Sequence, residues 1–494
     1  MLQYQLSLLQ NPKFMLLLIV ITFFTKGVFL VVLQPLFTGQ DEARHYNSIQ
    51  LIAEPHYPAN QITLPAGKEQ DKDNLSTYHF SEEIRETARA TDNHLLRADD
   101  FNTARFSDTS IGLQEGTINT KPWPASNLHY PPDAVQSSIL YHQLASVIEQ
   151  AFSDESIFTR FYLIRIFSVL LGTLAIFLAY LTARTIGFSP TTSLITTALI
   201  AFQPKFSLYS SQINYDTLLI PLFFLFTYAT ARAVRDGFTP INLTLLVGAI
   251  LPAILTKATG ALLSVVLLAL ILSWAYPKFT KFQSRHLRFA LMGTLMFVVF
   301  GSIVFLDQHF FRAEGSLVQK LSTLPTYLSK TLTWNKVVWP SETYWGMLGW
   351  TKSGVMQYAT TLIFIIEWAA VAGLTLLFFA KRLKENYPSF LPTKKQLLFL
   401  VIMMAVLQIG VRFADWNIYV SLDEKMSMSL GTPGRYFLPA LLAHILLITS
   451  GLGALLAYFK QERYFNPILL SLLILMTGLM LHTIFNVIIF RYYF

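Results

Sequence analysis

Residues 14–46 read FMLLLIVITFFTKGVFLVVLQPLFTGQDEARHY. The apolar run 14–33 is long enough for a helix to cross the hydrocarbon core of a bilayer, which needs about 20 residues. It is too long for the core of a signal peptide, is interrupted by Lys26 and is followed by no small-residue cleavage site, so we expect an anchored helix. Two adjacent carboxyl groups, Asp41 and Glu42, follow soon after it. The stretch therefore predicts a membrane protein with ionisable groups where the membrane meets water.

The composition of the whole chain agrees with a membrane protein. Of 494 residues 53% are hydrophobic and 13% charged, against about a quarter charged in soluble proteins. There is no cysteine, which excludes disulfides, thiolate nucleophiles and cysteine-ligated metals. The net charge of +8 is unevenly divided, because residues 34–133 hold 8 Lys/Arg and 15 Asp/Glu. An acidic block and a basic membrane body indicate membrane topology, and they exclude a nucleic-acid partner.

Apolar runs of spanning length recur along the chain. They lie at 14–33, 161–183, 190–211, 216–233, 240–256, 259–276, 289–307, 357–380, 396–413, 435–458 and 467–490. The two runs around Lys257 could instead form a kinked hairpin. We therefore predict an all-α polytopic membrane protein of about 11 transmembrane helices, with residues 1–494 as a single transmembrane domain.

Lysine and arginine are concentrated in alternate short loops, and such loops usually face the cytoplasm. The cations assigned to that side are Lys13, Arg184, Arg232, Arg235, Lys278, Lys281, Arg285, Arg288, Lys381, Arg382, Lys384, Lys394, Lys395, Lys460 and Arg463. This pattern predicts an internal N-terminus and an external C-terminus. Two long polar stretches, 34–160 and 308–356, then become extracytoplasmic loops. Within the first, 81–97 and 135–152 are predicted to be helical, the second lying along the membrane interface.

The first loop begins Gly39-Gln40-Asp41-Glu42-Ala43-Arg44-His45-Tyr46. Paired carboxylates at a membrane boundary can deprotonate a hydroxyl or hold a cation. On a helix, Asp41 and His45 would share one face. The alternative is an ordinary helix start, where acidic residues are favoured by the helix dipole. Zinc is disfavoured, because carboxylates with one histidine provide too few ligands.

Other ionisable residues stand in or beside the predicted spans: Lys26, Arg165, Asp216 and Glu367. A charge near the bilayer centre costs about 2.5–3.5 kcal/mol on insertion scales, so such groups should face the protein interior or a water-filled cavity. Arg165 and Asp216 are predicted at the outer boundary, on the same side as Asp41. Lys26 and Glu367 are predicted near mid-membrane, where they would neutralise one another.

Three further segments carry distinctive side chains. His129-Tyr130-Pro131-Pro132 precedes the interfacial helix and could be only a rigid corner. Residues 339–350, WPSETYWGMLGW, offer aromatic faces for a sugar ring, although interfacial Trp and Tyr are ordinary in membrane proteins. Residues 431–439, GTPGRYFLP, place Arg435 at a helix start, where it can bind a phosphate or simply reach the interface.

In their order along the chain, these motifs resemble the GT-C superfamily of polytopic glycosyltransferases. The shared features are an Asp-Glu pair at the start of a large outer loop, a His-x-Pro-Pro segment, an Arg opening the next helix (Arg165) and an Asp in a later outer turn (Asp216). Protein O-mannosyltransferases and the lipid A aminoarabinose transferase share this order. A mostly uncharacterised bacterial branch, with Pro-Asp-Glu-x-x-His, Trp-Gly-x-x-Gly-Trp and Gly-Arg-Tyr-x-x-Pro motifs, is more similar. This chain departs from it in two places. It has Gln40 where Pro is usual, and it has Asn214-Tyr215-Asp216 where the family often has Asn-Pro-Asp.

The resemblance implies an inverting transfer of a sugar from a polyprenyl-phosphate donor to a glycan, glycolipid or protein at the extracytoplasmic face of a bacterial inner or plasma membrane. It implies Asp41 as the catalytic base, with Glu42 beside it in acceptor or ion binding and as the competitor for the base. It also implies Arg165 and Arg435 as ligands of the donor phosphate. The substrate-binding residues that it implies are His45, His129, Tyr130, Asp216, Trp345, Trp350 and Tyr436. Some members of the superfamily need a divalent cation and others do not, so a metal stays open.

Two other classes of function are compatible with a polytopic chain. A transporter or flippase of lipid-linked glycans would place its charges at mid-membrane and often shows internal repeats. No repeat is visible in this sequence, and most of the candidate charges are predicted at one face. A non-catalytic scaffold for envelope assembly would not need its acidic and cationic groups to converge.

Overall fold

The computed structural model describes residues 10–39, 41–53, 81, 83–84, 87, 139–271, 317–331, 341, 343–346, 354–421 and 433–493. These residues form helices and turns, and they contain no β-strand element. They divide into two compact units. Unit 1 is Met1–Val20, Leu174–Phe206 and Leu219–Leu479, and unit 2 is Ile21–Thr173, Ser207–Leu218 and Met480–Phe494.

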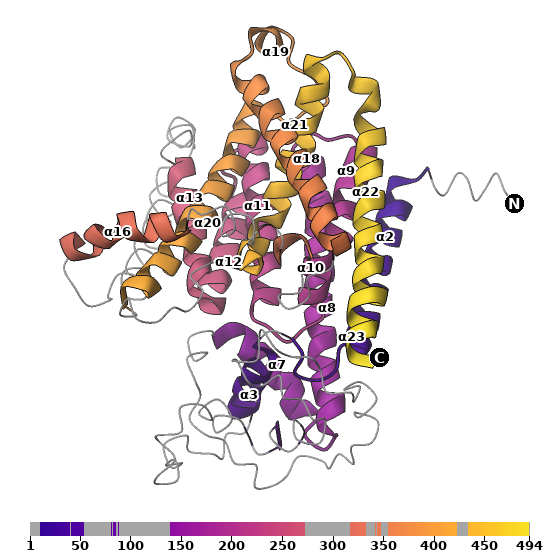
Figure 1. Cartoon of the computed structure of the whole chain (residues 1–494), viewed down its shortest axis with the longest axis vertical. Helices are drawn as coiled ribbons and strands as arrows, with labels where there is room; N and C mark the ends of the chain where they lie inside the picture. Colours follow the sequence, from indigo (N-terminus) through magenta and orange to yellow (C-terminus); the bar gives the residue numbers. More distant parts are fainter. Residues whose placement is uncertain are drawn as a thin grey trace, which may run out of the picture. The chain divides into compact units, whose positions relative to one another are not determined.

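Figure 1 shows the helices in chain order. The first half holds α2 (Pro12–Leu33), α3 (Glu42–Ala53), α7 (Ile139–Ala151), α8 (Ile157–Thr185), α9 (Pro190–Ala201), α10 (Pro204–Ser210), α11 (Asp216–Asp236), α12 (Pro240–Thr256), η5 (Ala258–Ala261) and α13 (Leu262–Leu270). The second half holds α16 (Leu317–Thr331), α18 (Gly354–Phe379), α19 (Lys381–Glu385), α20 (Lys394–Ser421), η8 (Gly434–Ala440), α21 (Leu441–Tyr458), η9 (Glu462–Tyr464), α22 (Phe465–His482), η10 (Thr483–Ile489) and α23 (Phe490–Tyr493).

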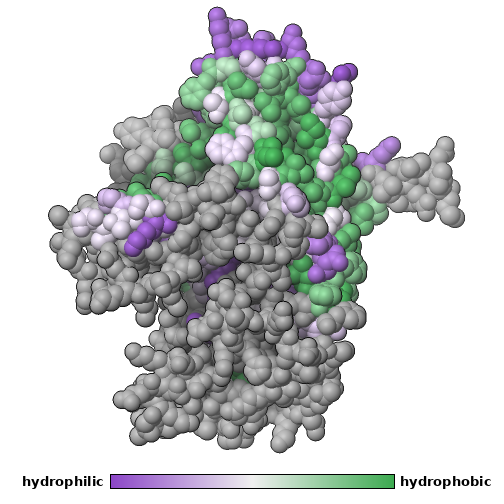
Figure 2. All heavy atoms as spheres, viewed as in Figure 1, coloured by the Kyte–Doolittle hydropathy of each residue, from purple (hydrophilic) through white to green (hydrophobic). Residues whose placement is uncertain are grey.

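Seven helical stretches in the described residues are long and apolar enough to cross a membrane. They are Pro12–Leu33, Ile157–Thr185, Asp216–Asp236, Tyr358–Phe379, Lys394–Trp416, Gly434–Tyr458 and Glu462–Ile489. The outer faces of α18, α20 and α22 are hydrophobic and exposed, for example at Ile365, Ile409 and Ile474, as Figure 2 shows for unit 1. Such surfaces are stable only against lipid, so the polytopic prediction is confirmed, whereas the predicted run at 289–307 lies outside the described residues.

One of the predicted spans is interrupted, and two neighbouring runs are separated by a break in the helix. The run 190–211 is divided into α9 and α10, because Pro204 cannot continue the hydrogen-bond ladder of the helix before it. The runs on either side of Lys257 are also separate helices, since Lys257 has an extended backbone (φ −161°, ψ 144°). A Cβ on Gly260 would lie 2.2 Å from the backbone of Ala253, so the chain folds back tightly after Lys257. The structure thus has a break at Lys257 between the two predicted apolar runs.

In unit 1, α18 and α21 lie side by side (Figure 1). Gly373 and Gly451 allow this contact, because a Cβ on Gly373 would lie 1.9 Å from the carbonyl oxygen of Gly451. Small residues that let two backbones approach are the usual contact between membrane helices.

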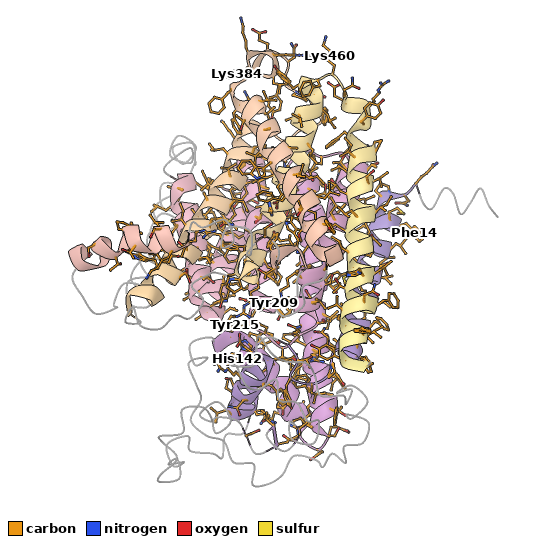
Figure 3. All side chains as sticks on the ribbon, in the orientation of Figure 1. Phe14, His142, Tyr209, Tyr215, Lys384 and Lys460 are labelled. Atoms are coloured by element: carbon orange, nitrogen blue, oxygen red, sulfur yellow. The ribbon has the colours of Figure 1, made fainter. Side chains whose placement is uncertain are left out.

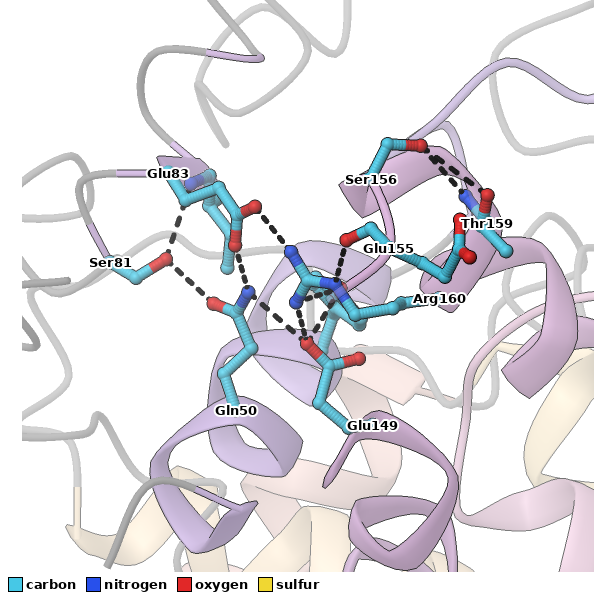
Figure 4. Close-up of polar contacts among 10 residues, drawn as sticks. Gln50, Ser81, Glu83, Glu149, Glu155, Ser156, Thr159 and Arg160 are labelled. Atoms are coloured by element: carbon cyan, nitrogen blue, oxygen red, sulfur yellow. Dashed lines mark hydrogen bonds and ion pairs between the residues drawn. The ribbon is translucent and has the colours of Figure 1, made fainter. Parts of the chain in front are cut away.

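Unit 2 is held together by a buried polar cluster around Arg160, shown in Figure 4. Arg160 forms ion pairs with Glu83 and Glu149, while Gln50 donates to Glu83 at 2.7 Å. The four side chains come from α3, α7, α8 and the short stretch near residue 83. The predicted interfacial helix 135–152 contributes through α7, which begins at Ile139 in the described residues. The predicted helix 81–97 is described only at Ser81, Glu83, Ile84 and Thr87.

Candidate functional site

Asp41 stands immediately before α3 with an unusual backbone. Its φ of 58° is left-handed, its side chain is exposed, and its carbonyl accepts the N–H of His45 at 3.0 Å. Aspartate tolerates this conformation better than most residues, but it remains strained, and such strain is concentrated at functional sites. Asp41 thus presents a carboxylate to solvent at the positive end of a helix.

Glu42, the adjacent carboxylate, is fully buried and paired with Arg165. The guanidinium Nε and Nη2 of Arg165 donate to the two carboxylate oxygens at 2.8 and 2.7 Å. The backbone N–H groups of Gly39 and Ile213 also donate to Glu42, each at 2.9 Å. Four donors surround this buried carboxylate and fix its position, so Glu42 has no accessible lone pair for taking a proton from a substrate.

The remaining N–H groups of Arg165 donate to backbone carbonyl groups. Nη1 donates to the carbonyls of Val31 (3.1 Å) and Gln34, and Nη2 donates to that of Pro35 at 2.9 Å. Since arginine has five N–H groups, this set occupies them all. The contacts favour a structural role for Arg165, closing the end of α2, over the expected role of binding a donor phosphate.

Two of the segments expected to carry the site converge within unit 2, and α7 joins them through His142. His45 Nδ1 and His142 Nε2 are 3.0 Å apart, and the edge of the His45 ring meets Tyr215 at a centroid distance of 4.6 Å. Figure 3 shows His142 and Tyr215 next to each other. A hydrogen bond between two imidazoles requires one nitrogen without hydrogen, so at most one of the pair is charged. Asp216, also buried, starts α11, and its N–H donates to Asn214.

The second expected phosphate ligand, Arg435, belongs to unit 1. Its guanidinium carbon lies 5.0 Å from the ring centroid of Tyr436, and Lys257 Nζ lies 4.9 Å from the same centroid. Lys205, buried like Arg435, is close enough to be repelled by the Arg435 charge. Two cations beside Tyr436, with Lys205 near one of them, form a region of positive potential, which attracts an anion such as phosphate.

Trp345 lines a pocket of about 310 Å³ in unit 1. Its indole N–H donates to Glu367 at 3.0 Å, and His444 Nε2 lies 3.2 Å from the same carboxylate oxygen. His444 Nδ1 is 3.1 Å from the hydroxyl of Tyr344, whose pKa is raised well above its usual value by burial and then by the Glu367 charge. Tyr344 therefore keeps its hydrogen and can donate it to His444.

Lys26 and Glu367, which the sequence predicts to neutralise one another, each have other partners. Glu367 is engaged by Trp345 and His444, and Lys26 donates to Ser207 at 2.7 Å. Spacing along the sequence could not reveal those partners, since each lies on another helix.

Three residues that the sequence predicts to belong to the site are not described by the structure, and four residues near the site were not predicted. His129, Tyr130 and Trp350 lie outside the described residues. Sequence reasoning did not select His142, Lys205, Lys257 or His444 as site residues. A lysine interrupting two apolar runs was the available signal for Lys257, whereas His142 looked like one polar position of an amphipathic helix. Within the described residues, no three His, Asp or Glu side chains converge as a metal site would require.

Comparisons with known proteins bear on this geometry. Residues 157–304 match the family model described as dolichyl-phosphate-mannose-protein mannosyltransferase. None of the curated proteins matches the chain.

Two solved structures of oligosaccharyltransferase from Archaeoglobus fulgidus align with the chain. One, a complex with Zn and sulfate, is 15% identical over 73% of this chain and 45% of its own, with a TM-score of 0.38. The other, with an inhibitory peptide and a dolichol-phosphate, is 13% identical over 96% of this chain and 56% of its own, with a TM-score of 0.43. The chain thus spans about half the length of these proteins. The family match and the apolar helices support a membrane glycosyltransferase.

Proposed function

We propose that the protein is an inverting glycosyltransferase of the GT-C class. It transfers a sugar from a polyprenyl-phosphate donor to a glycan, glycolipid or protein at the extracytoplasmic face of a bacterial inner or plasma membrane. The observation that carries the proposal is the exposed Asp41 carboxylate beside the buried Glu42–Arg165 pair. The match of residues 157–304 to a mannosyltransferase family model supports the reaction class.

Asp41 is proposed as the general base. Its carboxylate takes the proton of an acceptor hydroxyl while the hydroxyl oxygen forms a bond to the anomeric carbon from the face opposite the phosphate. The bond between that carbon and the phosphate oxygen breaks, and its electron pair leaves with the lipid phosphate. Glu42 is proposed to position Asp41, because its four hydrogen bonds fix the start of α3.

Arg435, Lys257 and Lys205 are proposed to bind the phosphate of the donor. Negative charge grows on the phosphate as the glycosidic bond breaks, and fixed positive charge stabilises that change. Arg435 supplies a planar, bidentate donor, whereas Lys205 and Lys257 supply compact charges. This assignment keeps the expected role of Arg435, adds two lysines and assigns Arg165 to structure.

The remaining candidates are proposed as substrate contacts. Trp345 and its aromatic neighbours line a pocket that also presents Glu367, which is the mixture of flat apolar faces and hydrogen-bonding groups that a sugar ring needs. His45, Asp216 and Tyr436 are proposed to contact donor or acceptor, as are His129, Tyr130 and Trp350 on sequence grounds.

The experiment compares Asp41→Asn with Glu42→Gln in purified full-length protein, using a panel of radiolabelled polyprenyl-phosphate sugars. Positioned proton transfer contributes about 10²–10⁴ in rate, so Asp41→Asn should lose most turnover and keep its melting temperature. Glu42→Gln should instead melt earlier, because breaking a buried ion pair costs about 3–5 kcal/mol. Asp154→Asn, an exposed aspartate in the turn after α7, is the matched control and should behave as the native protein.

Near-native transfer by Asp41→Asn would refute the assignment of the base. Binding of the lipid donor without transfer by the native protein, over the whole panel, would favour the scaffold or the transporter instead.

A further inference from the structure

One end of unit 1 carries a second pocket, of about 410 Å³, away from the residues assigned to catalysis. It lies where α18 leads into α19 and α21 leads into η9. Its polar lining consists of Arg382, Asn386, Ser389, Lys460 and Glu462. Two cations, an amide and a hydroxyl therefore face one space with a single carboxylate.

The pocket stands at the end of two apolar helices. Phe379, the last residue of α18, is 77% exposed, and Phe459, just after α21, is 61% exposed. Exposed phenylalanine rings at the ends of apolar spans are favourable where lipid covers them, so the pocket lies next to the lipid-facing surface. Figure 2 shows hydrophilic residues gathered at this end next to the hydrophobic helices, and Figure 3 labels Lys384 and Lys460 there.

Lys460 occupies a position that helices usually give to glycine. Its φ is 59°, its N–H donates to Ala457, and the N–H of Gln461 donates to Leu456 at 2.8 Å, which is the Schellman ending of a helix. A lysine in this left-handed conformation is less favourable than glycine. Lys460 therefore places a positive charge beside the pocket at a backbone position where glycine would be less strained.

The surrounding charge is mostly positive, although the exposed Glu385 pairs with Lys381 at 3.8 Å. Lys381, Lys384, Lys395 and Arg463 are exposed around the pocket residues, and this is the end that the positive-inside pattern predicts to be cytoplasmic. Basic pockets between membrane helices on that side suit anionic lipid headgroups. A guanidinium and an ammonium pair with a phosphate, while amide and hydroxyl groups can donate to its ester and glycerol oxygens.

We propose that this pocket binds the phosphate headgroup of an anionic phospholipid, with Arg382 and Lys460 as its two cationic ligands. The lipid source is favoured over a soluble phosphate, because the exposed aromatic residues beside the pocket would contact acyl chains. The proposal does not depend on the transferase reaction.

The test uses purified full-length protein in nanodiscs and in detergent with added lipid. We expect phosphatidylglycerol, and not phosphatidylcholine, to raise the melting temperature and to stay bound in native mass spectrometry. Arg382→Gln and Lys460→Gly should each weaken phosphatidylglycerol binding by about fivefold or more. Lys460→Gly separates binding from folding, because glycine suits the backbone there and should not lower the melting temperature of the lipid-free protein.

Lys384→Gln and Lys395→Gln are the matched controls, since both remove an exposed positive charge that does not line the pocket. They should keep native affinity. Equal losses in controls and pocket variants would overturn the proposal in favour of diffuse surface charge. Equal effects of the two lipids would also overturn it, as would stabilisation by soluble glycerol phosphate matching that by phosphatidylglycerol.

Discussion

Glu149 shows how a buried residue sets the pH dependence of stability. Its Oε1 accepts from Tyr46 and pairs with Arg160, while its Oε2 is buried without a hydrogen-bond partner among the described residues. Burial raises the pKa of Glu149 to about 7, and the Arg160 charge opposes that rise. The folded protein then holds a proton that the unfolded chain, with a glutamate pKa of about 4.3, releases more readily. This stabilisation is complete below about pH 4.3 and is lost as the pH rises toward 7.

We therefore expect the melting temperature to fall between about pH 4.5 and pH 7. Glu149→Gln, which imitates the protonated side chain, should flatten that profile in a thermal-unfolding series. Glu155→Gln, at an exposed turn next to α8, is the control and should keep the native slope. An unchanged slope in Glu149→Gln would exclude this residue as the titrating group.

At the same scale, the sequence revealed which residues are ionisable at the membrane boundary, but not their partners. Asp41 and Glu42 are adjacent and chemically similar, so no pattern could say which one is buried. The decision comes from Arg165, 123 residues further along the chain than Glu42. Tertiary folding alone brings such positions together.

At the scale of helices, the contact of α18 with α21 depends on glycines, which have no side chain to keep the two backbones apart. A Cβ on Gly451 would lie 2.2 Å from the carbonyl oxygen of Ala370. Gly451→Ala should force the helices apart and lower stability by about 1–3 kcal/mol, measured by thermal unfolding in detergent. Gly478→Ala in α22 adds the same methyl group where nothing lies within 4 Å, so it should be close to neutral. Similar melting temperatures for the two variants would contradict the packing argument.

Hydropathy located most of the spans because an apolar helix needs lipid or core around it. It could not locate the interruption after Ala201, since a helix end depends on the backbone and apolar side chains continue on both sides. Lys257, in contrast, marked the second interruption in the sequence. The proline at position 204 was the one local signal for the first break.

For the whole molecule, the distribution of lysine and arginine predicts that both long loops are external. Single cysteines test this directly, because the native chain has none. A cysteine replacing Ser107 should react with a membrane-impermeant maleimide in intact cells, and one replacing Lys384 should react only after the membrane is permeabilised. The reverse pattern would move the proposed catalytic face to the cytoplasm and contradict the topology.

The contacts of Arg165 have a consequence for how the chain folds while it is being synthesised. The guanidinium donates to three carbonyls at the end of α2, which a membrane helix otherwise leaves without partners. Until the ribosome has made residue 165, that end must remain hydrated. We therefore expect that α2 cannot adopt its final position before α8 has been inserted, and that a nascent chain halted within residues 34–160 carries an unfinished, protease-accessible stretch around residue 35.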